Sequence, residues 1–328
     1  MDVVVTGVGL ALAGAEREQE LLGHGPDPKA SVAPFDPAAR IGGRGLRYKD
    51  RASQLALCAA ADALAASGLV AADGRPTVNA ASVGVTASSN TGNLDTVCLA
   101  ASMLNEETSD GLSPMSLPNA SSNVVASSVA MQFGLRGPNL MLCNGPTSGL
   151  DAVYWATQLL AGGRCESAVV IGTEPRNAVV ARLCGVPEFA LFDGAAAVVL
   201  EGAAAARGRG ATPAARLGRF ARERGLAACI TRLLGGDGGG LGAWFTPESY
   251  NAKLVAPDVP RYDLSATFGL SSGALGVLQC VAAVGWLTSG GTGTALITTG
   301  DEGADAVSAL LVFPACERAD LPDKEHTP

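Results

Sequence analysis

The chain contains a repeated unit: a turn of small residues, a long apolar helix, a glycine-rich stop and an apolar strand. The first copy begins at Ser148-Gly149 and ends in the strand expected at Ser167 to Glu174. The second begins at Ser272-Gly273 and ends in the strand expected at Thr294 to Glu302. Both helices are apolar on all faces, which is typical of buried helices. A buried helix between two sheets, occurring twice, predicts two pseudo-symmetric halves of alternating helical and sheet layers.

A break between the halves is expected at Ala203 to Ala215, because glycine, proline and arginine there end the preceding strand. We therefore expect an N-terminal half of residues 1–206 and a C-terminal half of residues 207–328. At 328 residues the chain can bury a large core. Its 48% hydrophobic and 16% charged content favours a compact, heavily buried α/β protein.

Composition argues against several classes of partner. A net charge of −8 disfavours nucleic acid and anionic membranes. No apolar run is long enough to span a bilayer, and the start MDVVVTG has no basic n-region, so a cytoplasmic protein is expected. One basic cluster between residues 40 and 51 is read as a solvated helix start, with a patch for an acidic partner as the alternative. That cluster comprises Arg40, Arg44, Arg47, Lys49 and Arg51.

The cysteines show neither a CxxC pair nor metal-ligand spacing, so no metal site and no cofactor is expected. Most lie in apolar segments and are predicted to be reduced, buried small hydrophobes. Cys143 is included in that prediction, because it falls inside the apolar strand LMLC rather than at a helix N-terminus. The eight are Cys58, Cys98, Cys143, Cys165, Cys184, Cys229, Cys280 and Cys316.

The segment from Gly137 to Leu150 reads GPNLMLCNGPTSGL and is followed by DA. It resembles the strand-to-helix elbow of β-ketoacyl synthases. In that family a cysteine stands at the elbow, where the helix dipole and backbone N–H groups lower its pKa and activate it toward thioesters. Here Pro146 occupies the nucleophile position, and proline offers neither a side-chain nucleophile nor an N–H.

A second block, SATFGLSSGALG, resembles the family pattern K-x-x-x-G-H-x-x-G-A-x-G, with Ser265 for the lysine and Leu270 for the histidine. Leucine can neither carry a proton nor donate a hydrogen bond. The whole chain holds two histidines, His24 near its start and His326 in a polar tail. Three losses in one constellation predict a non-catalytic homologue.

The resemblance implies a thiolase-like α/β fold with two pseudo-symmetric halves and five α-β-α-β-α layers. Among such proteins the chain resembles the chain-length factors, the inactive partners of type II polyketide ketosynthases. The implied role is to complete the acyl tunnel of an active ketosynthase subunit, which receives its chain from an acyl carrier protein. The short second half favours a linear, reduced polyene chain over an aromatic one.

Two sets of residues follow from this resemblance. The helix after TASSNTG is implied to line the tunnel, and the helical spacing of Leu94, Val97 and Ala101 places these three gate residues on one face. The strand before the elbow is implied to pair across a heterodimer axis. Its residues are Asn139, Leu140, Met141, Leu142 and Cys143.

Two other functions stay open at the level of sequence. An acyltransferase or hydrolase of the same fold would use Ser148 or Cys143, and a serine nucleophile would need a base within hydrogen-bond reach. With no interior histidine, Glu174, Asp193 or Asp301 would have to serve. The other alternative is a scaffold protein that binds acyl chains without a ketosynthase.

Overall fold

A computed structural model describes residues 1–23, 33–43, 45–114, 117–235, 240–248, 250, 259–300 and 305–315. In this part of the chain ten strands join in one mixed sheet of order β3-β2-β4-β5-β1-β6-β10-β9-β7-β8. The strands are β1 (Val3–Leu12), β2 (Val83–Ser88), β3 (Asn139–Leu142), β4 (Ser167–Glu174), β5 (Gly194–Gly202), β6 (Ala215–Glu223), β7 (Leu241–Phe245), β8 (Arg261–Tyr262), β9 (Thr294–Thr299) and β10 (Val307–Pro314).

The strand order repeats between the two halves of the sheet. In the first half β2 is parallel to β3 and β4, and β5 is antiparallel to β4 and β1. In the second half β7 is parallel to β8 and β9, and β10 is antiparallel to β9 and β6. Within the sheet, the two halves join where Val4 and Val5 of β1 pair with Arg216 and Ala215 of β6. The predicted pseudo-symmetry is confirmed.

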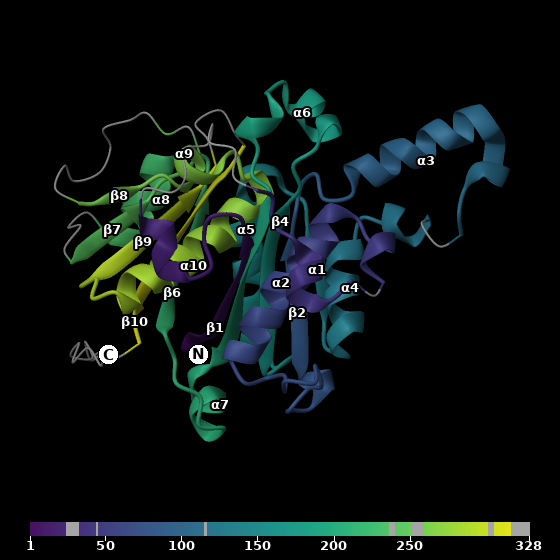
Figure 1. The fold of residues 1–328 in the computed structure, drawn as a ribbon. Coiled ribbons are helices and arrows are strands. Elements are labelled where there is room, and N and C mark those ends of the chain that lie inside the picture. The colour runs from purple at the N-terminus through teal and green to yellow at the C-terminus, as the bar shows by residue number, and fades with distance from the viewer. Residues whose placement is uncertain are drawn as a thin grey trace.

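Helices cover both outer faces and fill the middle (Figure 1). Helices α2 and α4 lie on the first half of the sheet, α8 lies on the second, and α5 and α10 lie between the halves, which gives the expected five layers. The helices are α1 (Pro37–Ile41), α2 (Arg51–Ala66), α3 (Leu94–Glu107), α4 (Val124–Phe133), α5 (Ser148–Ala161), α6 (Ala178–Cys184), α7 (Ala203–Gly208), α8 (Leu226–Leu234), α9 (Leu264–Phe268) and α10 (Leu275–Thr288).

The two central helices touch through glycines. A Cβ added at Gly276 of α10 would lie 2.5 Å from the backbone nitrogen of Leu150, and one added at Gly149 would lie 2.7 Å from the nitrogen of Gly276. Such distances leave no space for any side chain, so the helices cross backbone to backbone. This contact brings the N-terminal ends of α5 and α10 close together.

The boundary between the halves differs from the expectation in detail. Strand β5 ends at Gly202 as predicted, but the next six residues form the short helix α7 rather than an irregular linker. Alanine is the best helix former, and Ala203 begins a run of four. We propose that the halves divide within α7, at residues 206 and 207. In the described residues, no helix combines the length and hydropathy that crossing a bilayer requires.

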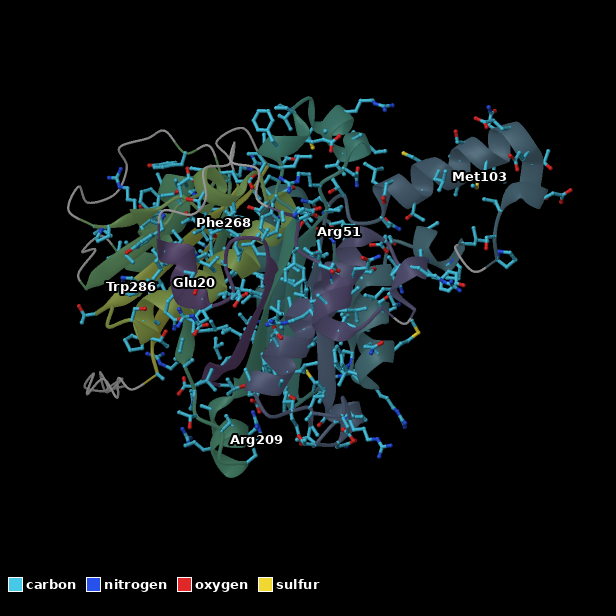
Figure 2. The ribbon with its side chains drawn as sticks, viewed as in Figure 1. Glu20, Arg51, Met103, Arg209, Phe268 and Trp286 are labelled. Carbon is cyan, nitrogen blue, oxygen red and sulfur yellow. The ribbon has the colours of Figure 1, made fainter. Side chains whose placement is uncertain are left out.

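One helix departs from this compact arrangement. Figure 1 shows α3 extending away from the body, and Figure 2 shows Met103 on it, far from Arg51 of α2. None of the fourteen residues of α3 is buried. Its sequence LDTVCLAASMLNEE is nevertheless largely apolar, and its exposed side chains include Leu99 (58% exposed) and Leu104 (50%).

Candidate functional site

The first elbow follows the edge strand β3. After Leu142 the chain passes through Cys143 and Asn144, makes a single 3₁₀ turn over Gly145–Thr147 and enters α5. Gly145 has φ +74°, a left-handed conformation that glycine adopts without strain. Pro146 lies inside this turn, where the fixed φ of proline suits a helix start. The elbow geometry is therefore present, with no nucleophile at its apex.

Ser148, the nearest hydroxyl on α5, is fully buried. Its Oγ accepts a hydrogen bond from the Asn144 N–H at 2.6 Å and lies 2.7 Å from the carbonyl oxygen of Gly145 and 3.0 Å from Oδ1 of Asn90. A serine nucleophile needs a base and access to substrate. The partners of Ser148 are an amide and two backbone groups, so its hydroxyl supports the turn.

The second elbow lies at the start of α10. The backbone N–H groups of Ser271 and Ser272 both donate to Oε1 of Glu248, at 2.5 and 2.7 Å. Ser272 has φ +41°, an unusual conformation for a non-glycine residue. Leu270, at the histidine position, is half-buried, and its backbone pairs with Ala190 and Phe192. The N–H groups of this elbow thus already bind a carboxylate of the same chain.

Asn90 joins the two elbows. Its Nδ2 group donates to the Gly145 carbonyl at 2.9 Å and to Oγ of Ser272 at 2.8 Å, while its Oδ1 accepts from the Gly145 N–H at 3.2 Å. One side chain therefore holds the start of α5 against the start of α10. A half-buried amide with both ends bonded holds this arrangement, because removing a partner would leave a polar group unsatisfied.

Glu174 closes the network from the end of β4. Its Oε1 accepts from the N–H groups of Asn90 (2.6 Å) and Gly273 (3.1 Å). Its Oε2 accepts from the Ser89 hydroxyl (3.0 Å) and from the N–H and hydroxyl of Thr91 (3.1 and 2.5 Å). Burial raises the pKa of this carboxyl, and the five hydrogen bonds act in the opposite direction. Burial likewise raises the pKa of Glu248.

The other candidate bases do not reach the elbow serine. Asp193 forms a two-pronged ion pair with Arg51, with nitrogen–oxygen distances of 2.8 and 3.2 Å. Asp301 lies outside the described residues, as do His24 and His326. Within the described segments, no histidine approaches either elbow. The geometry offers a tightly bonded polar junction rather than a nucleophile paired with a base.

The three expected gate residues lie on α3. Leu94 packs against a small apolar cluster that includes Val180, Ala181 and Leu191, whereas Val97 (39% exposed) and Ala101 face outward. A small cavity of about 80 Å³ lies on another side of α3, where Leu99 and other residues line it. Their role as a gate stays a prediction.

The expected pairing strand is the first edge of the sheet, because β3 pairs only with β2 in the described part of the chain. Asn139 is exposed, and Leu140, Met141 and Leu142 are half-buried. Cys143 lies just past the strand and is exposed, so its expected burial is wrong. Its thiol donates to the Ser89 carbonyl at 3.0 Å, and desolvation raises its pKa, which disfavours the reactive thiolate.

The expectations for the other cysteines are met in part. Cys98 and Cys184 are exposed, because α3 projects and α6 is a short surface helix. Cys316 lies outside the described residues. Four are buried as predicted: Cys58, Cys165, Cys229 and Cys280.

The basic cluster does not form one free patch. Arg40 pairs with Asp62, Arg51 pairs with Asp193, and the Arg47 guanidinium stacks on the ring of Tyr48. Arg44 lies outside the described residues. The interpretation as a helix start fits these contacts.

Sequence reasoning missed the residues that tie the elbows together. Glu174 carries a usable signal, because an acidic residue ends the otherwise apolar strand SAVVIGTE and must find donors when buried. Asn90 and Glu248 lie in short loops with no pattern of their own. Their roles depend on contacts between residues far apart in the chain.

Comparison with known proteins identifies this arrangement. Residues 27–181 match the family model described as "Beta-ketoacyl synthase, N-terminal domain". The matched segment is just under half of the chain and resembles that domain. The chain is 30% identical over 233 residues to 3-oxoacyl-[acyl-carrier-protein] synthase 2 of Vibrio harveyi, an alignment that covers 64% of this chain and 55% of that protein. It is 31% identical over 264 residues to the granaticin polyketide putative beta-ketoacyl synthase 1 of Streptomyces violaceoruber, covering 67% and 62%.

The alignments with these two relatives thus span little more than half of their length. The fold matches solved structures over nearly the whole chain. The ishigamide ketosynthase/chain length factor superimposes with a TM-score of 0.76 at 22% identity, covering 96% of this chain and 99% of that one. A type II polyketide synthase ketosynthase in complex with its acyl-carrier protein, AntDE:AntF, also gives 0.76 at 19% identity, covering 95% and 99%. These likenesses confirm the thiolase-like fold.

Proposed function

We propose that this protein is a non-catalytic subunit of the chain-length-factor type, which pairs with an active ketosynthase in a cytoplasmic type II polyketide synthase. The partner supplies the nucleophilic cysteine and both histidines. This chain stabilises the partner, completes its acyl tunnel and sets the length of the product.

Pro146 carries the proposal. The elbow that would present a nucleophile has a left-handed glycine and a helix start, but its apex residue Pro146 has no thiol, hydroxyl or N–H. The second elbow adds support, because Leu270 replaces a proton carrier and Glu248 already occupies the local N–H donors. Chemistry at this junction would require breaking several buried hydrogen bonds.

Two outer features suit a subunit that acts by contact. Strand β3 ends the sheet with half-buried Leu140 and Leu142, and a partner strand would complete it. Helix α3 holds Val97 and Ala101 in an exposed position, where a partner would enclose them and form the tunnel wall. Obligate interfaces of this kind bury on the order of 2,000 Å² or more and are largely apolar.

Co-expression tests the proposal. The ketosynthase to use is one from a type II polyketide synthase that has an intact cysteine and intact histidines. We expect the two chains to purify as a one-to-one heterodimer, and this chain to be less soluble when expressed alone. The proposed assembly would be contradicted if this chain were a stable, soluble monomer that bound none of the ketosynthases tested.

A further inference from the structure

An open cleft runs along α5, on the side away from its contact with α10. Its volume is about 640 Å³, within the range of about 300–1,000 Å³ usual for small-molecule sites. Asn144 and Asp151 lie at its elbow end, and side chains from α5, β6 and α8 form the remaining walls. The cleft uses neither Pro146 nor the exposed face of α3.

One wall of the cleft is aromatic. Tyr154 of α5 stacks on Phe220 of β6, with ring centroids 4.6 Å apart and planes inclined by 24°. Trp155 meets the edge of Tyr154 at 6.0 Å and is 47% exposed. Trp155 belongs to a helix of the central layer, yet about half of it is exposed. Part of its flat apolar ring therefore faces the cleft. Such surfaces favour flat, unsaturated or aromatic partners.

The opposite part of the cleft carries two guanidinium groups. The side chain of Arg222 is 49% exposed, and its Nε lies 3.5 Å from Oδ1 of Asp151. The side chain of Arg232 is 70% exposed and pairs with Glu223 at 2.7 Å. The buried Asp151 carboxylate also accepts from the Thr147 hydroxyl at 2.8 Å and from Nδ2 of Asn144 at 3.1 Å. Its charge is therefore shared among several donors.

The segment around the cleft is basic within an acidic protein. Strand β6 and helix α8 together contain four arginines and one acidic residue, whereas the whole chain has a net charge of −8. A local excess of arginine raises the local concentration of anions. The planar guanidinium fork matches carboxylate and phosphate oxygens in two-point contacts.

We propose that this cleft binds an amphipathic oxyanion: a molecule with a flat, unsaturated or aromatic body and a carboxylate or phosphate at one end. The body lies along Trp155 and the Tyr154–Phe220 stack, and the anionic head lies between Arg222 and Arg232. None of these side chains belongs to β3 or α3, although α5 packs against β3.

A fluorescent polyene carboxylate, cis-parinaric acid, provides the probe. We expect the full chain, alone or in its complex, to bind one molecule of the acid per chain. Its uncharged methyl ester should bind at least about tenfold more weakly, which corresponds to about 1.4 kcal/mol. Because the head-group contact is exposed, raising the salt concentration should weaken binding of the acid and leave that of the ester unchanged.

Variants test which residues bind the head group of the ligand and which bind its body. The double variant Arg222→Gln/Arg232→Gln should weaken the acid by at least about tenfold without affecting the ester. Arg224→Gln removes one positive charge from a neighbouring exposed position outside the cleft and should have no effect. Trp155→Ala should weaken acid and ester alike. Circular dichroism melts establish that each variant folds.

Competition separates the two head groups. 2-Naphthoate and 2-naphthyl phosphate share one flat aromatic body, and the better competitor identifies the preferred oxyanion. Failure of both to displace the probe would overturn the proposal. So would unsaturable binding, or equal affinity of the wild type and the double arginine variant for the acid.

Discussion

The junction of the two elbows differs from the surface formed by α3 and β3 in how far the side chains find partners within the chain. At the junction, Asn90 and Glu174 bind backbone and hydroxyl groups from both elbows, and Ser148 is fully buried. On α3 no residue is buried, and leucines such as Leu99 are more than half exposed. Asn90, Glu174 and Ser148 find their hydrogen-bond partners within the chain, whereas the apolar side chains of α3 are not covered by it.

This difference supports the proposed function. A catalytic centre needs polar groups that remain available to substrate. At the junction the polar groups form hydrogen bonds that hold α5 against α10. An exposed apolar helix marks an interaction surface, because monomers rarely leave such patches open. The contrast favours function by contact over function by chemistry.

The largest expected effect comes from charging the edge strand. Leu140→Asp or Leu142→Asp would bury a carboxylate in the proposed interface, a change that costs several kcal/mol unless the charge is paired. We expect ketosynthase binding to weaken by at least about 100-fold, or about 2.8 kcal/mol, measured by pull-down and analytical ultracentrifugation. Ala71→Asp, at an exposed turn, is the control and should bind normally. Normal pairing by both leucine variants would remove β3 from the interface.

The next effect concerns the junction. In Glu174→Gln one carboxylate oxygen becomes an NH₂ group facing N–H and O–H donors, so buried hydrogen bonds are lost. We expect the free energy of unfolding to fall by about 1–3 kcal/mol in urea titrations. Glu166→Gln, at an exposed position, should change it little. Equal stability of the two variants would show that the junction does not depend on this carboxylate.

The same variant carries a pH signature. The pKa of Glu174 is raised above its ordinary 4.5, so the folded state binds this proton more tightly than the unfolded state. Stability from this group is therefore present at low pH and lost as pH rises from the ordinary value through the raised one. The stability advantage of wild type over Glu174→Gln should shrink across that window, by at most about 1.4 kcal/mol per pH unit. An advantage that grows with pH would reverse the assigned direction.

The smallest effect on the fold is expected on α3. Ala101→Phe adds a ring at an exposed position, so the stability of the chain should change by no more than about 0.5 kcal/mol. In the complex the same ring would block the proposed tunnel, and products should become shorter while early condensations continue. Mass spectrometry of the products checks this, with Val97→Phe as a second variant. An unchanged product spectrum for both would exclude these residues from the gate.

The sequence predicted the repeated architecture well, because its signal is local. The all-apolar helix after Ser272-Gly273 and the matching one after Ser148-Gly149 lie in the middle layer as expected. Helix α2 begins at Arg51, because Asp50 caps it by accepting from the Ser53 N–H. The missing nucleophile at the elbow was likewise predictable from the sequence, because it depends on the single residue Pro146.

The tertiary contacts at the elbows could not be predicted from the sequence. The bonds of Asn90 to Gly145 and Ser272 join residues 55 and 182 positions apart, and no sequence spacing encodes such pairs. The aromatic cleft arises in the same way, because Tyr154 and Phe220 meet only when α5 lies against β6. The exposure of α3 was also missed, since an apolar helix gives the same periodic pattern whether its own chain or a partner covers it.

The central claim is that the nucleophile belongs to another subunit. Its most direct test is a condensation assay with acyl and malonyl thioesters of an acyl carrier protein, followed by mass spectrometry. Three samples are compared: this chain alone, this chain with an intact ketosynthase, and this chain with a ketosynthase whose cysteine is replaced by alanine. We predict product only in the second sample. Replacing this chain by its Pro146→Cys variant in all three samples should give the same result. Product from this chain alone, or with the cysteine-free ketosynthase, would contradict the account.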